Sequence, residues 1–222
     1  MNLKEFKKIL KNGTDEAKHK AMSNADLSLL NIEIFDILFE LLKDSNPNNR
    51  FFAIFHLIDK FPKSLSKIKD DYITEIYNTL FDEYTPVADR ATWALSIAGE
   101  KALEKLVKEY HSGSIDTKIK IVYAIGRGKF SEHSKKRIQI LLDGIKSDND
   151  NLKFQAMSAI MSNTNLESKN IWNSVDNPSI DLKKIHKMIL PIAKEFNKSS
   201  NKHFKDSSVI YINWIEKTYN KV

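Results

Sequence analysis

A short helical pattern recurs four times along this chain, and this repetition limits the folds that the chain can adopt. With small variations, a basic or small residue precedes Ala-x-x-[Ala/His]-[Leu/Ile] in RFFAIFHL (50–57), ADRATWAL (88–95), KIKIVYAI (118–125) and KFQAMSAI (153–160). The last residues, Leu57, Leu95, Ile125 and Ile160, stand 38, 30 and 35 residues apart. A repeat of this period, with helical spacing inside it, predicts stacked pairs of helices that cover one another's apolar faces.

The composition favours helices joined by short turns. The 222 residues include only 6 glycines and 5 prolines, and 41% of them are hydrophobic, as in an ordinary globular core. There is no cysteine, which excludes disulfides, thiol catalysis and Cys-based zinc sites. No run approaches the ~20 apolar residues that span a bilayer, and the first residues lack the apolar stretch of a signal peptide. We expect a cytoplasmic protein without a membrane partner.

Helix signals along the chain predict one domain over residues 1–222. Residues 1–30 hold the N-terminal helices, 31–162 the repeats, and 163–222 a linker and two helices that cap the stack. The expected helices are 3–11 and 14–22, the outer and inner pairs 32–43 with 48–60, 71–83 with 87–98, 100–110 with 116–126 and 132–146 with 149–161, and finally 181–198 and 206–220.

Capping residues set these expected boundaries. Thr14, Ser131 and Asp206 are predicted N-caps, because their side-chain oxygens can accept hydrogen bonds from first-turn N–H groups. Pro191 predicts a kink in its helix. Three glycines are expected at helix ends that need a positive φ: Gly99, Gly113 and Gly126.

The repeats resemble HEAT repeats of the short, bacterial, phycobilisome-lyase-like type, which carry a similar Ala-x-x-Ala-Leu core on each inner helix. The resemblance covers about 32–162 and is best at VADRATWALSIAG (87–99), whereas His56 stands where alanine is usual. It implies an all-α, right-handed α-solenoid of about four antiparallel helix pairs with capping helices at both ends, an ARM-type fold. Proteins of this family serve as scaffolds, adaptors and, in a few cases, enzymes.

Two stripes run along each inner helix. At about 100° per residue, the positions one and four before the anchor share its face and form the core stripe, where small residues let helices approach closely. These are Ala53, His56, Ala91, Ala94, Ile121, Ala124, Ala156 and Ala159. We expect His56 to be a hydrogen-bonded core histidine.

The opposite stripe combines aromatic and basic residues, and it is the candidate binding site. Its aromatic and basic members, which are the candidate binding residues, are Phe52, Phe55, Arg90, Trp93, Lys120, Tyr123 and Arg127. Asp59 and Ile97 share the stripe in the first two repeats, and the fourth repeat adds Gln155, Ser158 and Ser162. In solenoids that the repeats resemble, inner helices line the concave wall, so this stripe would form an aromatic and basic groove. The alternative is that the rings pack against neighbouring repeats.

The net charge of +6 is modest, and 31 of the 35 basic residues are lysine. Planar, bidentate phosphate recognition favours arginine, so solvated lysines explain most of this excess. A basic face that binds an anionic partner stays open as an alternative.

The chain carries no conventional catalytic constellation, and we expect neither an enzyme nor a cofactor or metal. The six histidines are scattered without a His-x-x-x-His pair. The segment 126–130, GRGKF, lacks the upstream glycine, the Ser/Thr after lysine and the preceding strand of a phosphate loop. We interpret it as a helix end followed by a basic turn.

One local segment offers an enzymatic alternative. WNSVD, Trp172 to Asp176, resembles the Trp-Asp-Ser-Val-Asp segment of the HEAT-like alkylpurine DNA glycosylases. The resemblance implies that Trp172 contacts the lesion and that Asp176 stabilises the oxocarbenium-like sugar. The chain departs from that family at Asn173, where a second Asp is usual, at the helix-breaking Asn177-Pro178, and in having only two helices afterwards.

The leading prediction is a non-catalytic binding or scaffold module that recognises a macromolecular partner, foremost a protein, through the concave inner-helix face. A bacterial adaptor or an immunity-type protein would fit this reading by fold-level analogy. The alternative is a nucleic-acid-binding HEAT-like protein that uses Arg90, Lys120, Arg127 and the basic tail, including the glycosylase. Affinity for phosphates falls steeply with salt concentration, which separates the two. The partner and the oligomeric state do not follow from the sequence.

Overall fold

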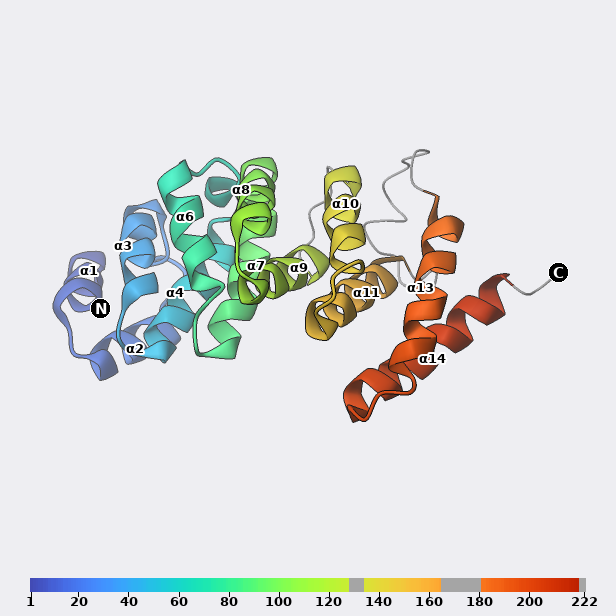
Figure 1. The fold of residues 1–222 in the computed structure, drawn as a ribbon. Coiled ribbons are helices and arrows are strands. Elements are labelled where there is room, and N and C mark those ends of the chain that lie inside the picture. The colour runs from blue at the N-terminus through green and yellow to red at the C-terminus, as the bar shows by residue number, and fades with distance from the viewer. Residues whose placement is uncertain (128–133, 165–180, 220–222) are drawn as a thin grey trace. The chain divides into compact units, whose positions relative to one another are not determined.

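The computed structural model describes residues 1–127, 134–164 and 181–219, and every regular element among them is helical (Figure 1). The predicted all-α class is therefore confirmed. The chain divides into two compact units, Met1–Leu106 and Val107–Val222, which we call unit 1 and unit 2. The prediction that the whole chain forms one domain stays a prediction.

Unit 1 is built from helix pairs that stack in chain order. Its elements are α1 (Leu3–Asn12), α2 (Asp15–Ser23), η1 (Ile32–Ile34), α3 (Phe35–Glu40), η2 (Leu41–Lys43), α4 (Pro47–Lys60), α5 (Pro62–Leu65), α6 (Asp70–Thr79) and α7 (Thr85–Ala98), followed by α8 (Glu100–Ser112), which runs into unit 2. α1 packs on α2, α3 and η2 pack on α4, and α6 packs on α7. The inner helices α2, α4 and α7 also pack in succession, as in an α-solenoid.

Small residues form the seam between the inner helices of unit 1. Ala53, Ala91 and Ala94 are fully buried there, so the predicted core stripe is confirmed in this unit. His56 is also buried, and its Nε2 lies 3.0 Å from the carbonyl oxygen of Met22 on α2. Burial lowers the pKa of His56, so its neutral ring donates this hydrogen bond. The predicted hydrogen-bonded core histidine is confirmed.

In unit 1, ion pairs join α2 and α4 to the turn that begins the next inner helix. Arg50 on α4 donates to both carboxylate oxygens of Asp82, from Nε at 2.6 Å and from Nη2 at 2.8 Å. Its Nη1 also donates to the carbonyl oxygens of Asp44 and Ser45. Lys18 on α2 lies 2.8 Å from Asp44 in the same way. Bidentate pairing of this kind fixes geometry as well as adding energy.

Unit 2 contains the end of α8 and five further helices in the described ranges. These are α9 (Ile115–Arg127), α10 (Ser134–Gly144), α11 (Asp150–Thr164), α13 (Leu182–Phe196) and α14 (Lys202–Tyr219). α10 pairs with α11, α9 packs along α11, and α13 pairs with α14. A Cβ on Gly144 would lie 2.7 Å from the Cβ of Ala156, so α10 and α11 are in close contact.

The hairpin of α13 and α14 covers α11, as expected for a terminal cap. Phe154 on α11 stacks on Phe204 with ring centroids 4.2 Å apart and meets the edge of Phe196 at 5.5 Å. Pro191 lies inside α13, and the kink expected there stays a prediction. The side chain of Asp181 caps α13 by accepting from the N–H of Lys184 at 2.9 Å.

One predicted helix is divided, and two predicted helix boundaries were wrong by four residues. The helix expected over 32–43 is split into η1, α3 and η2, because its ends tighten into 3₁₀ turns. α6 ends at Thr79 instead of 83, since the next N–H groups bond three residues back in successive turns. α14 begins at Lys202 instead of Asp206, because Asn201 caps it by accepting from His203 and Phe204. The short helix α5 was not predicted.

The predicted glycine roles are confirmed at one position only. Gly99 has φ 76°, and it is the one glycine with positive φ among the described residues. Gly126 lies within α9, which continues to Arg127. At Gly113 the requirement is space, since a Cβ would lie 2.6 Å from both the Glu109 carbonyl oxygen and Thr117 Cγ2. The Thr14 cap is confirmed by its hydrogen bond from Ala17, while Ser131 lies outside the described residues.

Candidate binding surfaces on the inner helices

In unit 1, two phenylalanines of α4 and an arginine of α7 form a half-buried cluster. Phe51 and Phe55 stack with ring centroids 6.2 Å apart. The Cζ of Arg90 lies 5.9 Å from the Phe51 centroid and 5.7 Å from the Phe55 centroid. A guanidinium at this distance is attracted by the electron-rich ring face. Trp93, also half-buried, follows one turn later on α7. We call these four residues the aromatic patch.

The structure places Phe52 differently from the rest of its predicted stripe. Its ring meets the edge of His19 on α2, with centroids 5.3 Å apart, and so it packs against the preceding repeat. Phe51, which the stripe analysis left out, joins Arg90 instead. The sequence left two interpretations of the aromatic stripe open: packing between repeats, or an aromatic and basic groove. On α4, Phe52 packs between repeats, whereas Phe55 lies beside the Arg90 guanidinium.

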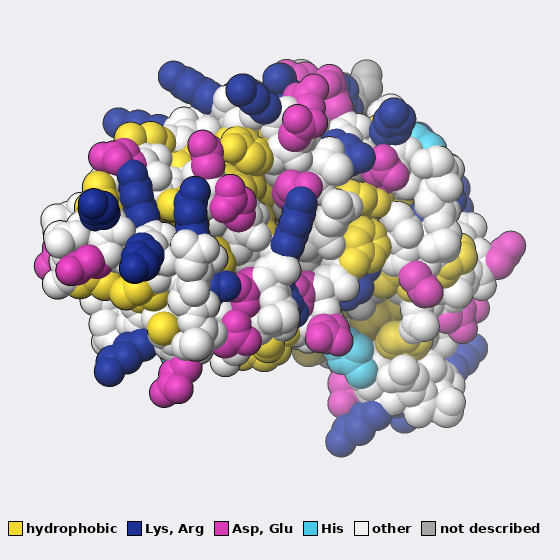
Figure 2. Space-filling view, turned by 90° about the vertical axis from the view of Figure 1, so that its left-hand side faces the viewer, with side chains coloured by type: hydrophobic (Ala, Val, Ile, Leu, Met, Phe, Trp, Pro, Cys, Tyr) yellow, Lys and Arg dark blue, Asp and Glu magenta, His cyan; other side chains and the backbone are white. Residues whose placement is uncertain are grey.

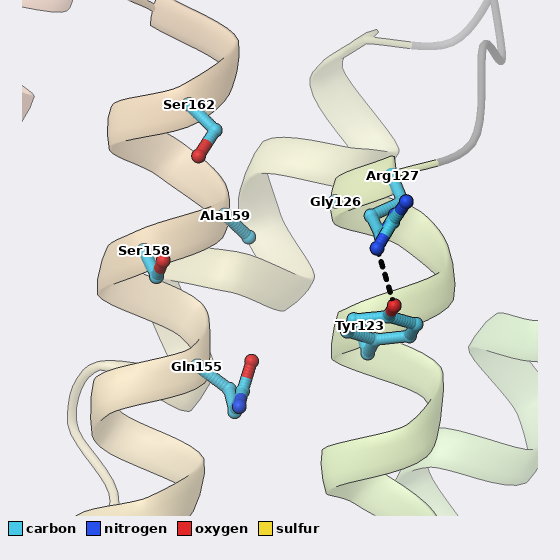
Figure 3. A pocket seen from close by; sticks show the side chains of 7 residues that line it. All are labelled: Tyr123, Gly126, Arg127, Gln155, Ser158, Ala159 and Ser162. Carbon is cyan, nitrogen blue, oxygen red and sulfur yellow. Dashed lines mark hydrogen bonds between the residues drawn. The ribbon is translucent and has the colours of Figure 1, made fainter. Parts of the chain in front are cut away.

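In unit 2, a hollow of about 300 Å³ lies between α9 and α11, which run side by side in the same direction (Figure 3). Its lining residues are Tyr123, Gly126, Arg127, Gln155, Ser158, Ala159 and Ser162. Five of these seven belong to the stripe that the sequence assigned to the binding face. The others, Gly126 and Ala159, are small residues that leave space between the two helices.

Arg127 is held against one wall of the hollow by the tyrosine one turn before it. Its Nη1 donates to the Tyr123 hydroxyl at 2.6 Å, and its Cζ lies 5.3 Å from the ring centroid (Figure 3). On the facing wall, the hydroxyls of Ser158 and Tyr211 on α14 are 2.8 Å apart. Lys120, although exposed on α9, is not among the lining residues.

The charge of the chain is divided unequally between the units. Unit 1 has 15 basic and 17 acidic residues, a net charge of −2, whereas unit 2 has 20 and 12, a net charge of +8. On the face at the α1 end of the molecule, side chains of both signs are interspersed over the surface (Figure 2). Among the described residues that line the hollow, Arg127 is the one that carries a charge.

The titratable groups with the largest pKa shifts lie in the packed interior. Burial lowers the pKa of Arg137 to about 10, and its Nη2 donates to the Ile125 carbonyl at 2.9 Å. Burial likewise lowers the pKa of His186 to about 4, and its Nδ1 is 2.7 Å from the Tyr219 hydroxyl. Burial and a hydrogen bond to Asp143 raise the pKa of Tyr110. These groups serve packing between helices.

Two searches of the described residues bear on cofactors and membranes. No group of three or more His, Asp or Glu side chains there could hold a metal ion. None of the helices in those ranges is long and apolar enough to cross a membrane. Trp172, Asn173 and Asp176 lie outside the described residues, and the glycosylase alternative that rests on them stays a prediction.

The sequence matches no family model and no curated protein. Solved structures with a related arrangement of helices include a designed armadillo repeat protein in complex with the peptide (KR)4, at 18% identity and a TM-score of 0.45, covering 96% of this chain and 91% of that one. Another is the archaeal HEAT-like repeats protein from Thermococcus onnurineus NA1, at 15% identity and a TM-score of 0.40, covering 98% of both chains.

A third, human deoxyhypusine hydroxylase in complex with glycerol, has 13% identity and a TM-score of 0.35, covering 97% of this chain and 84% of that one. These structures carry no conclusion about what this protein does. The fold class follows from the chain's own helices: within each unit the described residues form stacked helix pairs, so the protein is all-α with the packing of an α-solenoid.

Proposed function

We propose that this protein is a non-catalytic binding module that recognises a protein partner through the inner-helix face. The observation that carries the proposal is the aromatic patch, in which Phe51, Phe55 and Trp93 are left half-buried beside Arg90. Aromatic residues and arginine supply most of the energy at protein interfaces, because they bury a large area and lose little conformational entropy.

The chemistry of the patch favours a protein over a nucleic acid. Nucleic-acid binding depends on several cations that contact phosphates, whereas the patch has one arginine and lies in a unit with a net charge of −2. Phe51 and Phe55 present apolar ring surface, which a partner's aliphatic or aromatic side chains can cover.

The non-catalytic part of the proposal is supported by where four groups with shifted pKa values lie. His56, Tyr110, Arg137 and His186 have shifted pKa values, and each hydrogen-bonds to another helix or turn within the packed interior. A catalytic group would instead be expected in a cleft that substrate can enter. An adaptor or an immunity-type protein is the kind of role that this arrangement suits.

The test is quantitative capture of partners from the native host. The tagged protein is compared with a Trp93→Ala/Tyr123→Ala variant and with a Phe81→Ala/Tyr84→Ala variant. Phe81 and Tyr84 are exposed aromatic residues outside the inner helices, so they control for loss of any surface ring. We expect the first variant to lose its specific partner by about 10-fold or more and the second to retain it. Equal retention by both variants would contradict the proposal.

A further inference from the structure

We propose that the partner places an aspartate or glutamate side chain against Arg90 in the aromatic patch of unit 1. This inference rests on the proposed function, and it deepens it by naming the chemical group that the partner brings to the patch. Arg90 belongs to α7 and the two phenylalanines beside it to α4, and these helices pack side by side (Figure 1).

The Arg90 guanidinium contacts ring faces and has donors to spare. Its Cζ lies 5.9 Å from the Phe51 centroid and 5.7 Å from the Phe55 centroid. A ring face attracts the cation but is at best a weak hydrogen-bond acceptor. Within residues 1–127, 134–164 and 181–219, the Arg90 side chain makes no hydrogen bond and no ion pair. Its five N–H donors can therefore bind an acceptor that the partner supplies.

Arg50, the other arginine of unit 1, shows how this protein accommodates a guanidinium that is covered. Its side chain is 11% exposed. Nε and Nη2 donate to the two carboxylate oxygens of Asp82, and Nη1 donates to the carbonyl oxygens of Asp44 and Ser45. All three nitrogens of Arg50 thus have acceptors, and a carboxylate takes two of them because its oxygens match the guanidinium fork. Arg90 has aromatic rings in place of these acceptors.

A partner that covers the aromatic patch would take water away from Arg90. Phe51, Phe55 and Trp93 are half-buried like Arg90 itself, so the apolar surface that a partner would cover adjoins the cation. Removing a charge from water is costly unless an opposite charge replaces the lost hydration. The partner must therefore bring an acceptor, and a carboxylate both compensates the charge and fits the fork.

The composition of the patch favours one acidic side chain over a polyanion. The patch contains a single cation, and unit 1 has a net charge of −2. A nucleic-acid strand would need several cations along its path, whereas one carboxylate gains its energy from a direct, charge-assisted contact. The rings of Phe51 and Phe55 are apolar, so the residues that flank the acidic side chain should be aliphatic or aromatic.

The experiment selects short random peptides displayed on phage. The library is first depleted on Arg90→Gln, which removes peptides that bind elsewhere on the protein, and is then selected on the wild type. Lys67→Gln is the matched control, because it removes one positive charge from an exposed position of unit 1 outside the inner helices. Arg90→Lys keeps the charge but loses the fork. All four proteins are first shown to have the same helical circular dichroism.

The most enriched peptide is then made in two forms, one with its acidic residues and one with the corresponding amides. Both forms carry a fluorescein label and an amidated C-terminus, so that side chains supply the only carboxylates. Fluorescence anisotropy measures their affinity for each protein. A double-mutant cycle between peptide and protein shows whether the carboxylate acts through Arg90.

We expect the selected peptides to be enriched in aspartate or glutamate flanked by apolar residues. The change from acid to amide should weaken binding to the wild type by about 10-fold and to Arg90→Gln by less than about twofold. Arg90→Lys should bind the acidic form with an intermediate affinity, and Lys67→Gln should bind it like the wild type.

Three results would overturn the inference. The first is a selection that yields no peptide, or only peptides without acidic residues. The second is an equal loss from acid to amide in the wild type and in Arg90→Gln. The third is an oligothymidylate that binds more tightly than the acidic peptide and depends on Arg90.

These outcomes are distinguishable from failure of the proposed function. Loss of the native partner in the Trp93→Ala/Tyr123→Ala variant, together with selected peptides that lack acidic residues, would leave the binding module standing and remove only the carboxylate. Retention of the partner by that variant, together with an acidic peptide that depends on Arg90, would do the reverse.

Discussion

Unit 1 and unit 2 use the same repeat but place their cations differently. Arg50 and Lys118 both stand seven residues before the anchor of their inner helix. Arg50 makes a bidentate pair with Asp82 in the turn of the next repeat, whereas Lys118 lies over the ring of Tyr110, at 5.2 Å from its centroid. The same position in the repeat therefore makes an ion pair in one unit and a cation–π contact in the other.

The difference extends to the charge of each unit. Unit 1 balances its charges and uses Lys18 and Arg50 to join repeats, whereas unit 2 has eight more basic than acidic residues. A cation committed to a structural pair contributes little to the field outside the protein, while an excess of cations attracts anions. The comparison teaches that the repeated apolar and small residues specify how the helices stack. The charged residues at the remaining positions decide whether a unit has a net charge that attracts ions of the opposite sign.

The largest expected effect separates the two kinds of contact. Arg50→Ala leaves the largely buried carboxylate of Asp82 without its partner, and we expect a loss of about 3 kcal/mol in the free energy of unfolding. Lys118→Ala should cost about 1 kcal/mol or less. Urea unfolding followed by circular dichroism measures both. Equal losses would break the distinction between the units.

Overpacking the inner seam should affect both units alike. Ala94 in unit 1 and Ala124 in unit 2 are fully buried, and replacing either by leucine is expected to cost about 1–3 kcal/mol. The measurement is again the urea midpoint of Ala94→Leu and Ala124→Leu. If only one of the two substitutions lowered the urea midpoint, the inner helices of the other unit would have room for a leucine, although the alanine there is fully buried.

Acid should destabilise unit 2 through His186. Burial holds its pKa at about 4, below the 6.5 of an unperturbed histidine. Between these values the unfolded chain takes up a proton that the folded chain does not. The contribution is therefore complete above about pH 6.5 and falls as the pH drops towards 4. Linkage gives a loss of about 2 kcal/mol between pH 7 and pH 5.

The check on this expectation is the pH dependence of urea unfolding in the wild type and in His186→Gln. The glutamine variant, which cannot titrate, should have a flatter dependence over the same range. Parallel curves for the two proteins would mean that His186 does not have the depressed pKa.

The smallest expected effect concerns the wall of the hollow. Tyr211→Phe removes the hydroxyl that lies 2.8 Å from Ser158, and we expect a loss of about 1 kcal/mol in stability. Ser207→Ala, at a half-buried serine on the same helix, is the control for a general loosening of α14.

The fold was predictable where one physical signal dominated. The inner helices combine strong periodicity with small residues at the seam, and these fixed α4, α7, α9 and α11 to within a few residues. Helix starts were less predictable, because Asn201 and Asp206 are both good N-caps and the pattern of apolar residues does not choose between them. Asn201 is the cap in the structure.

The candidate site was predictable in part for a similar reason. The helical period placed Tyr123 and Arg127 on the predicted binding face of α9, and Gln155 on the corresponding face of α11. In the structure all three line the same hollow. Periodicity could not reveal that Phe52 meets His19, since that contact depends on how α2 lies against α4. Nor could it show that Phe51 joins Arg90, because the partner comes from another helix.

The most direct test of the binding face is site-specific photo-crosslinking to the captured partner. A photoreactive phenylalanine derivative replaces Trp93 or Tyr123 on the inner helices, or Phe81 or Tyr84 outside them, one position at a time. The account predicts crosslinks to the partner from positions 93 and 123 and none from positions 81 and 84. Crosslinks from 81 and 84 alone would contradict it.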